Sequence, residues 1–179
     1  MSKTPVREAL KTLAGAGLVI MNPYKGAAVR VVDDELARHV YDARLLIEPE
    51  ALARAVTRGH DWRPALAALT RADHAPDQAE RSLANRDFHR ELYAGCGNPL
   101  LVKMLDDLRD QTALVSATAW RHEPDHAQTP GWEHEAAEHR AMLRAARDGE
   151  AERAAGLLRH HITSFVARNF PEPQENQEA

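Results

Sequence analysis

Cysteine and long apolar runs are scarce in this chain, and each shortage excludes a class of protein. The 179 residues include one cysteine, Cys96, which excludes an intrachain disulfide and is compatible with a reducing cytoplasm. No apolar run approaches the ~20 residues that span a bilayer, and no signal-peptide pattern opens the chain. We therefore expect a cytoplasmic protein that does not interact with a membrane.

Aromatic residues make up only 5% of the sequence, but apolar residues as a whole reach 44%, which is enough for the core of one ordinary domain. Alanine, leucine, arginine and glutamate dominate, and they favour helix over sheet. The apolar spacing predicts a mainly α fold, with a bundle of about six helices in a domain over residues 33–170. The expected helices cover about 33–58, 62–72, 77–93, 98–121, 132–147 and 150–169. We expect a loop over 122–131 and a disordered polar tail over 171–179.

Residues 1–32 have a different character and are predicted to form a separate small domain. Residues 1–30 carry five basic side chains against one acidic side chain, although the whole chain has a net charge of −4. A helix ending at Gly15 and Gly17 is expected first, followed by two strands around an Asn-Pro-Tyr-Lys-Gly turn. A basic helix followed by a hairpin is the second half of a winged helix-turn-helix. One face of that helix has the spacing of a buried stripe: Val6, Ala9, Leu10 and Leu13.

Ten histidines suggest a metal site, but the most obvious motif among them does not fit one. The segment HEAAEHR resembles the HExxH motif of zinc proteases, in which the two histidines lie four residues apart on one helix face. Here His134 and His139 are five residues apart, which separates them by about 140° around the helix. We therefore reject a protease site in this segment.

A better set of ligands comes from three different helices. In NRDFHREL, Asn85 and His89 are four residues apart and share a helix face, whereas Asp87 points elsewhere. His139 and His161 lie on two further helices. Three imidazoles and one oxygen donor converging inside a bundle would suit Zn²⁺ or another first-row divalent ion. The alternative is that these histidines are exposed or bonded within the core.

Four segments resemble one family of regulators. MSKTPVREALKTLAGAGLVIMNPYKGAAV is similar to the distal part of the DNA-binding domain of GntR-family transcription regulators. The rest of the chain resembles the FCD effector domain of the FadR-type branch. The matching segments are DARLLIEPEALARA from Asp42, NRDFHRELYAGCGNPLL from Asn85, and EHRAMLRAARDGEAERAAGLLRHHI from Glu138. Together the segments cover nearly the whole chain in the order of the family.

The resemblance implies a divalent metal ion held by Asn85, His89, His139 and His161. Zinc is the expected ion, with nickel or manganese as alternatives. Many relatives carry Asp at the position of Asn85, and an amide oxygen brings no negative charge. The pocket would therefore keep a net positive charge, and a small carboxylate effector could complete the metal shell. His160 is expected to lie at the periphery, and the other histidines at the surface.

Arg44 matches a family arginine that faces the effector cavity, where it could bind a carboxylate through two hydrogen bonds. The alternative is a helix-surface pair with Glu48, four residues further on.

The resemblance also assigns DNA contacts to the first 32 residues. The recognition helix would enter the major groove, where Lys3 and Arg7 would read bases. Lys3 replaces the more frequent arginine. The contacts to phosphates and the tip of the wing would come from Thr4, Lys11, Lys25 and Gly26. The alternative for Arg7 and Lys11 is a solvated helix face with Glu8 as the local partner.

The first two helices and first strand of the family's DNA-binding domain are absent from this sequence. The favoured explanation is an internal methionine taken as the start, with a deliberate shortening or a truncated gene as alternatives. We expect this form to bind DNA weakly or not at all and a chain extended upstream to bind it, which gel-shift titration of both forms would test.

These observations predict a ligand-responsive transcription regulator rather than an enzyme. We expect it to act as a homodimeric repressor on double-stranded operator DNA. One alternative is an effector-binding module that does not bind DNA in this form. A metal-dependent hydrolase is the other alternative, but no acidic residue in the matched motifs is placed as its general base.

Overall fold

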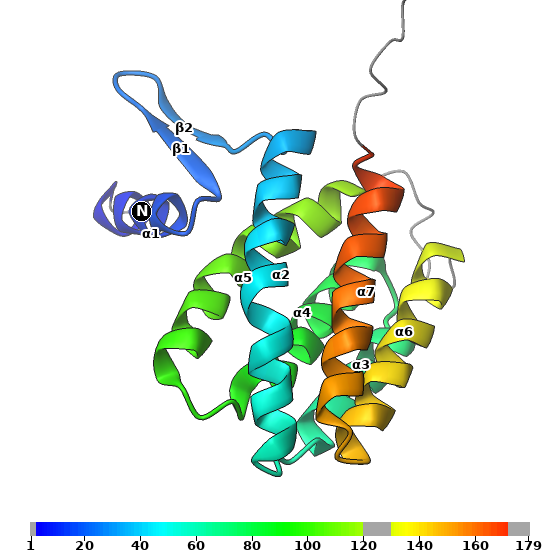
Figure 1. The fold of residues 1–179 in the computed structure, drawn as a ribbon. Helices are drawn as coiled ribbons and strands as arrows, with labels where there is room; N and C mark the ends of the chain where they lie inside the picture. Colours follow the sequence, from blue (N-terminus) through cyan, green and yellow to red (C-terminus); the bar gives the residue numbers. More distant parts are fainter. Residues whose placement is uncertain (1–2, 120–129, 172–179) are drawn as a thin grey trace, which may run out of the picture.

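A computed structural model describes residues 3–119 and 130–171. Within these ranges the chain forms seven helices and one two-stranded antiparallel sheet (Figure 1). The elements are α1 (Lys3–Gly15), β1 (Val19–Asn22), β2 (Gly26–Val29), α2 (Asp34–Thr57), α3 (Arg63–Asp73), α4 (Gln78–Ala94), α5 (Pro99–Ala119), α6 (Pro130–Arg147) and α7 (Ala151–Asn169). The prediction of a mainly α fold with a six-helix bundle is confirmed.

The N-terminal helix and hairpin form as the sequence predicts. Gly17 ends the turn after α1 with a positive φ of 76°, a conformation that glycine adopts without strain. In the hairpin, Asn22 pairs with Gly26, and the amide of Lys25 donates to the carbonyl of Asn22 across the turn. Figure 1 shows α1 and the hairpin standing to one side of the bundle.

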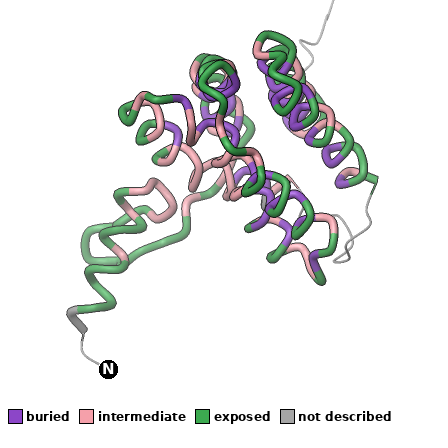
Figure 2. Tube along the Cα trace, turned by 90° about the horizontal axis from the view of Figure 1, so that it is seen from below, coloured by how far each residue is buried: buried purple, intermediate pink, exposed green. Residues whose placement is uncertain are grey.

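The apolar stripe of α1 has the spacing of a buried face but is largely exposed among the described residues. Val6 is 48% exposed and Leu13 is 40% exposed, and Leu10 is only partly covered. The tube in Figure 2 is green and pink along α1 and the hairpin, whereas the bundle helices carry purple segments on their inner sides. The described residues leave most of this stripe uncovered.

Side-chain caps mark the starts of three of the bundle helices. The Asp33 carboxylate accepts a hydrogen bond from the Leu36 amide at 2.8 Å, and Asp77 caps α4 in the same way through the Glu80 amide. The side chain of Asn98 accepts from the first amides of α5. These caps fall where the sequence places them, within two residues of each predicted start.

One predicted helix start differs from the structure, and several predicted features lie outside the described residues. The helix expected from Trp132 begins at Pro130, because proline is tolerated in a first turn whose amides have no intrahelical acceptor. The rest of the predicted loop, the predicted end at Arg121 and the tail after Pro171 fall outside the described residues.

One face of α4 is buried within the bundle. Helix α2 packs along α7 and against α5, α6 packs along α7, and α4 contacts α2, α3 and α5. A continuous core joins these helices, with Phe88, Leu52 and Leu158 completely buried. Among the described helices, none is both long and apolar enough to cross a bilayer. The packing turns one face of α4 toward α6 and α7, where the site lies.

Candidate metal and effector site

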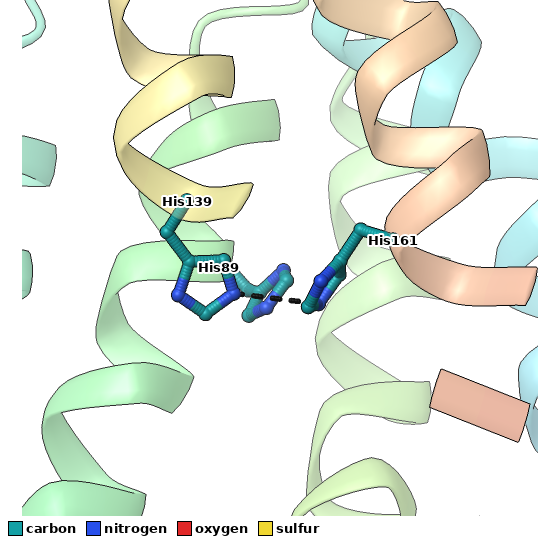
Figure 3. Close-up of side chains that lie close together, drawn as sticks. All are labelled: His89, His139 and His161. Carbon is teal, nitrogen blue, oxygen red and sulfur yellow. Dashed lines mark hydrogen bonds between the residues drawn. The ribbon is translucent and has the colours of Figure 1, made fainter. Parts of the chain in front are cut away.

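Three histidines from three helices meet in the interior of the bundle. His89 comes from α4, His139 from α6 and His161 from α7, and the three rings point toward one another in Figure 3. The Nε2 atoms of His139 and His161 are 3.3 Å apart, and one nitrogen from each ring lies within 4.8 Å of the others. The sequence predicted this meeting, and the described residues bring these side chains together.

The spacing and protonation of the rings suit a metal ion. Two nitrogens bound tetrahedrally to Zn²⁺ at about 2.0–2.1 Å lie about 3.3–3.4 Å apart, which matches the His139–His161 separation. Burial lowers the pKa of His89, and burial together with the other cationic groups lowers the pKa of His139 well below its usual value. Burial also lowers the pKa of His161 to about 4, although Glu138 opposes the shift. The imidazoles are therefore neutral near pH 7, as metal ligands must be.

Two of the three rings have a carboxylate behind them. Glu138 accepts a hydrogen bond from Nδ1 of His161 at 2.7 Å, and Oε1 of Glu48 lies 3.2 Å from Nδ1 of His89. A carboxylate behind Nδ1 fixes the ring and leaves the Nε2 lone pair for a metal. His139 differs, because its Nδ1 has no hydrogen-bond partner among the described residues.

The fourth predicted ligand, Asn85, lies in the same cavity as His89 and His161. Asn85 is 8% exposed, and its Oδ1 accepts no hydrogen bond from the described part of the chain. A buried acceptor without a donor costs about 1–3 kcal/mol, and a cation would satisfy it. The residues present therefore fit a divalent ion with nitrogen and oxygen ligands.

The cavity beside the histidines has a volume of about 40 Å³. Because one water needs roughly 10–15 Å³ by this measure, the cavity admits a few waters or a small acid group. Its walls come from α2, α4, α5, α6 and α7. Polar lining side chains include Tyr41, Arg44, Arg86, Arg109, Thr112, Ser116 and Glu135.

Arg44 combines the two roles that the sequence left open. It lines the cavity, and its Nε donates to Oε2 of Glu48 at 2.7 Å. The pair is not on the helix surface, because the Arg44 and Glu48 side chains are 5% and 2% exposed. Burial alone would raise the pKa of Glu48, but Arg44 and the hydrogen bond from His89 outweigh it and hold the pKa at about 2. Arg44 therefore lines the cavity and at the same time forms a buried ion pair with Glu48.

The predicted DNA-contacting residues lie in α1 and the hairpin. Arg7 and Lys11 are exposed on α1, where Nζ of Lys11 pairs with Glu8 at 2.8 Å. Lys25 is exposed in the hairpin turn, and Gly26 opens β2. Lys3 and Thr4 occupy the first turn of α1. Their roles at DNA stay predictions.

The remaining described histidines lie outside the cluster. His134 is exposed and accompanies Arg168 and Glu138, while His139 faces the core, as their spacing of five residues predicts. His160 is exposed. The expectation of a surface position is wrong for His60, whose side chain is 19% exposed and packs edge-on against Trp62. His122 and His126 fall outside the described residues.

Sequence reasoning missed the supporting roles of Glu48 and Glu138. The spacing of Arg44 and Glu48 is visible in the sequence, but a pair four residues apart looks the same at a surface or in a core. Glu138 precedes His139 directly, yet its carboxylate serves His161 on the next helix. Packing between helices creates both contacts.

Comparison with known proteins identifies the class. The sequence profile of the FCD domain matches residues 39–164. The chain is 29% identical over 171 residues to the HTH-type transcriptional repressor GlaR of Escherichia coli, across 90% of this chain and 77% of GlaR. It is 30% identical over 175 residues to the uncharacterized HTH-type transcriptional regulator BphR of Paraburkholderia xenovorans, across 90% of this chain and 68% of BphR.

Solved structures share the fold. A GntR transcriptional regulator from a Rhodococcus species superposes with a TM-score of 0.80 at 20% identity, over 97% of this chain and 83% of that one. Escherichia coli McbR/YncC gives 0.79 at 20% identity, over 97% and 87%.

The chain belongs to the FCD-domain branch of the GntR-family transcription regulators. This family and the matched relatives regulate transcription and are not enzymes, which rules out the hydrolase alternative.

Proposed function

We propose that this protein is a metal-dependent, ligand-responsive repressor whose FCD domain senses a small organic acid. The observation that carries the proposal is the convergence of the three neutral imidazoles beside a cavity lined by Arg44. Asn85, His89, His139 and His161 would hold the ion, with zinc favoured and nickel or manganese as alternatives. When bound, the ion supplies a Lewis-acidic position that attracts a carboxylate.

The charges in the site favour an anionic effector. The imidazoles and the Asn85 amide are neutral, and the Arg44 and Glu48 charges offset each other. A divalent ion would therefore add positive charge that none of its four protein ligands cancels. A small carboxylate would compensate that charge and fit a cavity of about 40 Å³.

Regulation would act through a homodimer. The effector must bind one relative placement of the two DNA-binding segments more tightly than the other, because only differential affinity shifts such an equilibrium. Arg7, Lys11 and Lys25 are exposed and basic, which supports contact with operator DNA through α1 and the hairpin. The names of GlaR and of the probable D-xylose utilization operon repressor of Paenarthrobacter nicotinovorans support repression.

Metal analysis of the purified protein tests the proposal. We expect one divalent ion per chain, and its identity separates zinc from nickel and manganese. His161→Ala should abolish stoichiometric binding, because it removes a ring whose Nε2 faces that of His139. His160→Ala is the matched control, since this exposed neighbour on α7 should leave binding unchanged. The proposal would be refuted if the chelated wild type takes up no metal on reloading. It would also be refuted if both variants lose metal binding equally.

A further inference from the structure

His89 is the only one of the three clustered rings whose Nδ1 faces two described groups of opposite hydrogen-bonding character. Oε1 of Glu48 lies 3.2 Å from this nitrogen, and an amino nitrogen of the Arg44 guanidinium lies 3.4 Å from it. A carboxylate only accepts hydrogen bonds and a guanidinium only donates them. Both partners come from α2, one turn apart, and both are buried.

One ring nitrogen cannot serve both partners at once. If Nδ1 carries the proton, it donates to Glu48, and Nε2 keeps a lone pair. If Nδ1 is bare, it accepts from Arg44, and the single proton of the neutral ring moves to Nε2. Only the first form offers Nε2 to a metal ion. The partner at Nδ1 therefore determines whether His89 is a ligand.

We infer that Arg44 and Glu48 act together as a tautomer selector for His89, and that an acid bound at Arg44 is thereby coupled to metal binding. This inference rests on the metal site proposed above. Glu48 is a positioning residue, because it acts on the ion only through His89. Arg44 holds Glu48 through a 2.7 Å hydrogen bond, so the two contacts of this carboxylate compete for its charge.

The coupling has a definite sign. A carboxylate that binds the Arg44 guanidinium neutralises part of the positive charge that Glu48 otherwise neutralises alone. It weakens donation from Arg44 to His89 and leaves Glu48 free to accept from Nδ1. The ligand form of His89 is then favoured, so acid and metal strengthen each other's binding, and linkage makes the effect reciprocal.

The equivalent contact at His161 lacks this feature. Glu138 accepts from Nδ1 of His161 at 2.7 Å, and its other oxygen accepts from Ser164. Arg168 approaches Glu138 at 3.9 Å, and its guanidinium lies 2.9 Å from Nε2 of His134. Glu138 should therefore support the metal without linking it to Arg44.

Nitrogen NMR of the imidazoles in the zinc-free 179-residue chain tests the selector, since the two tautomers have distinct ¹⁵N shifts. The His89 signals are assigned by their loss in His89→Gln. In the wild type we expect a mixture of the two tautomers, with the proton mainly on Nδ1. In Glu48→Gln we expect it to move to Nε2, and addition of acetate as the probe acid should move it back. Unchanged His89 shifts in Glu48→Gln would overturn the inference.

Zinc affinity, measured by chelator competition, gives a second readout. Loss of a carboxylate behind a ligating histidine typically lowers metal affinity 10–100-fold, and we expect a loss in this range for Glu48→Gln. Glu138→Gln should also weaken zinc binding but leave the His89 tautomer unchanged. Glu50→Gln is the matched control, because Glu50 pairs with Arg54 at the same spacing on an exposed face of α2 and should change neither readout.

The outcomes separate the two proposals. A wild type that binds no divalent ion would refute the proposed function. A wild type that binds zinc, with Glu48→Gln binding it equally well, would refute the selector and leave the metal site standing. If Glu48→Gln does not fold, the acetate titration of the wild type still decides. The selector predicts stronger proton occupancy at Nδ1 as acetate binds, and a shift toward Nε2 would contradict it.

Discussion

Asn85 is the residue that distinguishes this site electrostatically. Its amide oxygen is buried and lacks a donor among the described residues, yet it brings no charge to a position beside three neutral rings. The carboxylates nearby, Glu48 and Glu138, act on the rings from behind and are each tied to another polar group. The charge of the ligand set is therefore set by this one position.

We expect Asn85→Asp to strengthen zinc binding about tenfold or more, which is about 1.4 kcal/mol, because it adds a negative charge to the shell. In zinc-free protein the same change should lower the thermal midpoint, since a buried carboxylate without a partner is costly. Chelator competition and thermal unfolding with and without zinc measure both effects.

Asn98→Asp is the matched control for this prediction. Asn98 caps α5 away from the histidines, and aspartate caps equally well. It should leave zinc affinity unchanged. Weaker zinc binding in Asn85→Asp than in the wild type would contradict the proposed ligand set.

At the scale of the elements, helix ends and close approaches hold α4 in register with its neighbours. Asp77 caps the start of α4, eight residues before Asn85. After α4 ends, Gly95 lies close to the side chain of His60. These features lie outside the cavity, so they affect stability more than chemistry.

Asp77→Ala should lower the free energy of unfolding by about 1 kcal/mol, the usual effect of removing an N-cap. The Glu80 amide then loses its acceptor. Denaturant unfolding measures the change, and Asp148→Ala in the exposed turn after α6 should have little effect. A loss in the control as large as in Asp77→Ala would argue against the cap as the cause.

Two glycine substitutions should have opposite effects on stability. A Cβ at Gly95 would lie 2.4 Å from Nδ1 of His60 and 2.7 Å from its Cβ, so Gly95→Ala forces backbone or ring to move and should destabilise by about 1–3 kcal/mol. Gly156 is exposed inside α7 with no heavy atom within 4 Å of its added Cβ. Gly156→Ala should stabilise by about 0.5–1 kcal/mol. Thermal and denaturant unfolding of both variants would reveal the difference in sign.

On the scale of the whole molecule, the candidate ligands tie three helices together but do not reach α1 or the hairpin. The ligands lie on α4, α6 and α7, and Glu48 adds α2 through His89. The N-terminal segment approaches the bundle where Gly17 lies close to the side chain of Gln111 on α5. Metal binding should therefore stabilise the bundle directly and the N-terminal segment little.

Hydrogen exchange with and without zinc tests this division. Zinc at 100 times its Kd should stabilise the folded bundle by about 2.7 kcal/mol, and slower exchange is expected in α2, α4, α6 and α7. Residues 3–29 should exchange at the same rate in both states. The His161→Ala variant should show no zinc effect. Equal protection of the N-terminal segment would contradict the expected division.

The sequence by itself determined the helices, the hairpin and the family. Helical spacing of apolar residues, the caps at Asp33 and Asp77 and the turn glycines are local features that act within a few residues, so they can be read from the chain. Resemblance to the family selected His89, His139 and His161 from ten histidines. Spacing alone could not, because these residues are 50 and 22 positions apart.

Only the tertiary structure decided which partners these side chains have. Whether Arg44 and Glu48 form a surface pair or a buried one depends on how α2 packs against α4 and α7, and that packing also brings Glu48 to His89. The partial burial of His60 and the contact of Glu138 with His161 on α7 follow from interhelical packing. Local sequence encodes the face of a helix, whereas the neighbour that meets this face is set by long-range packing.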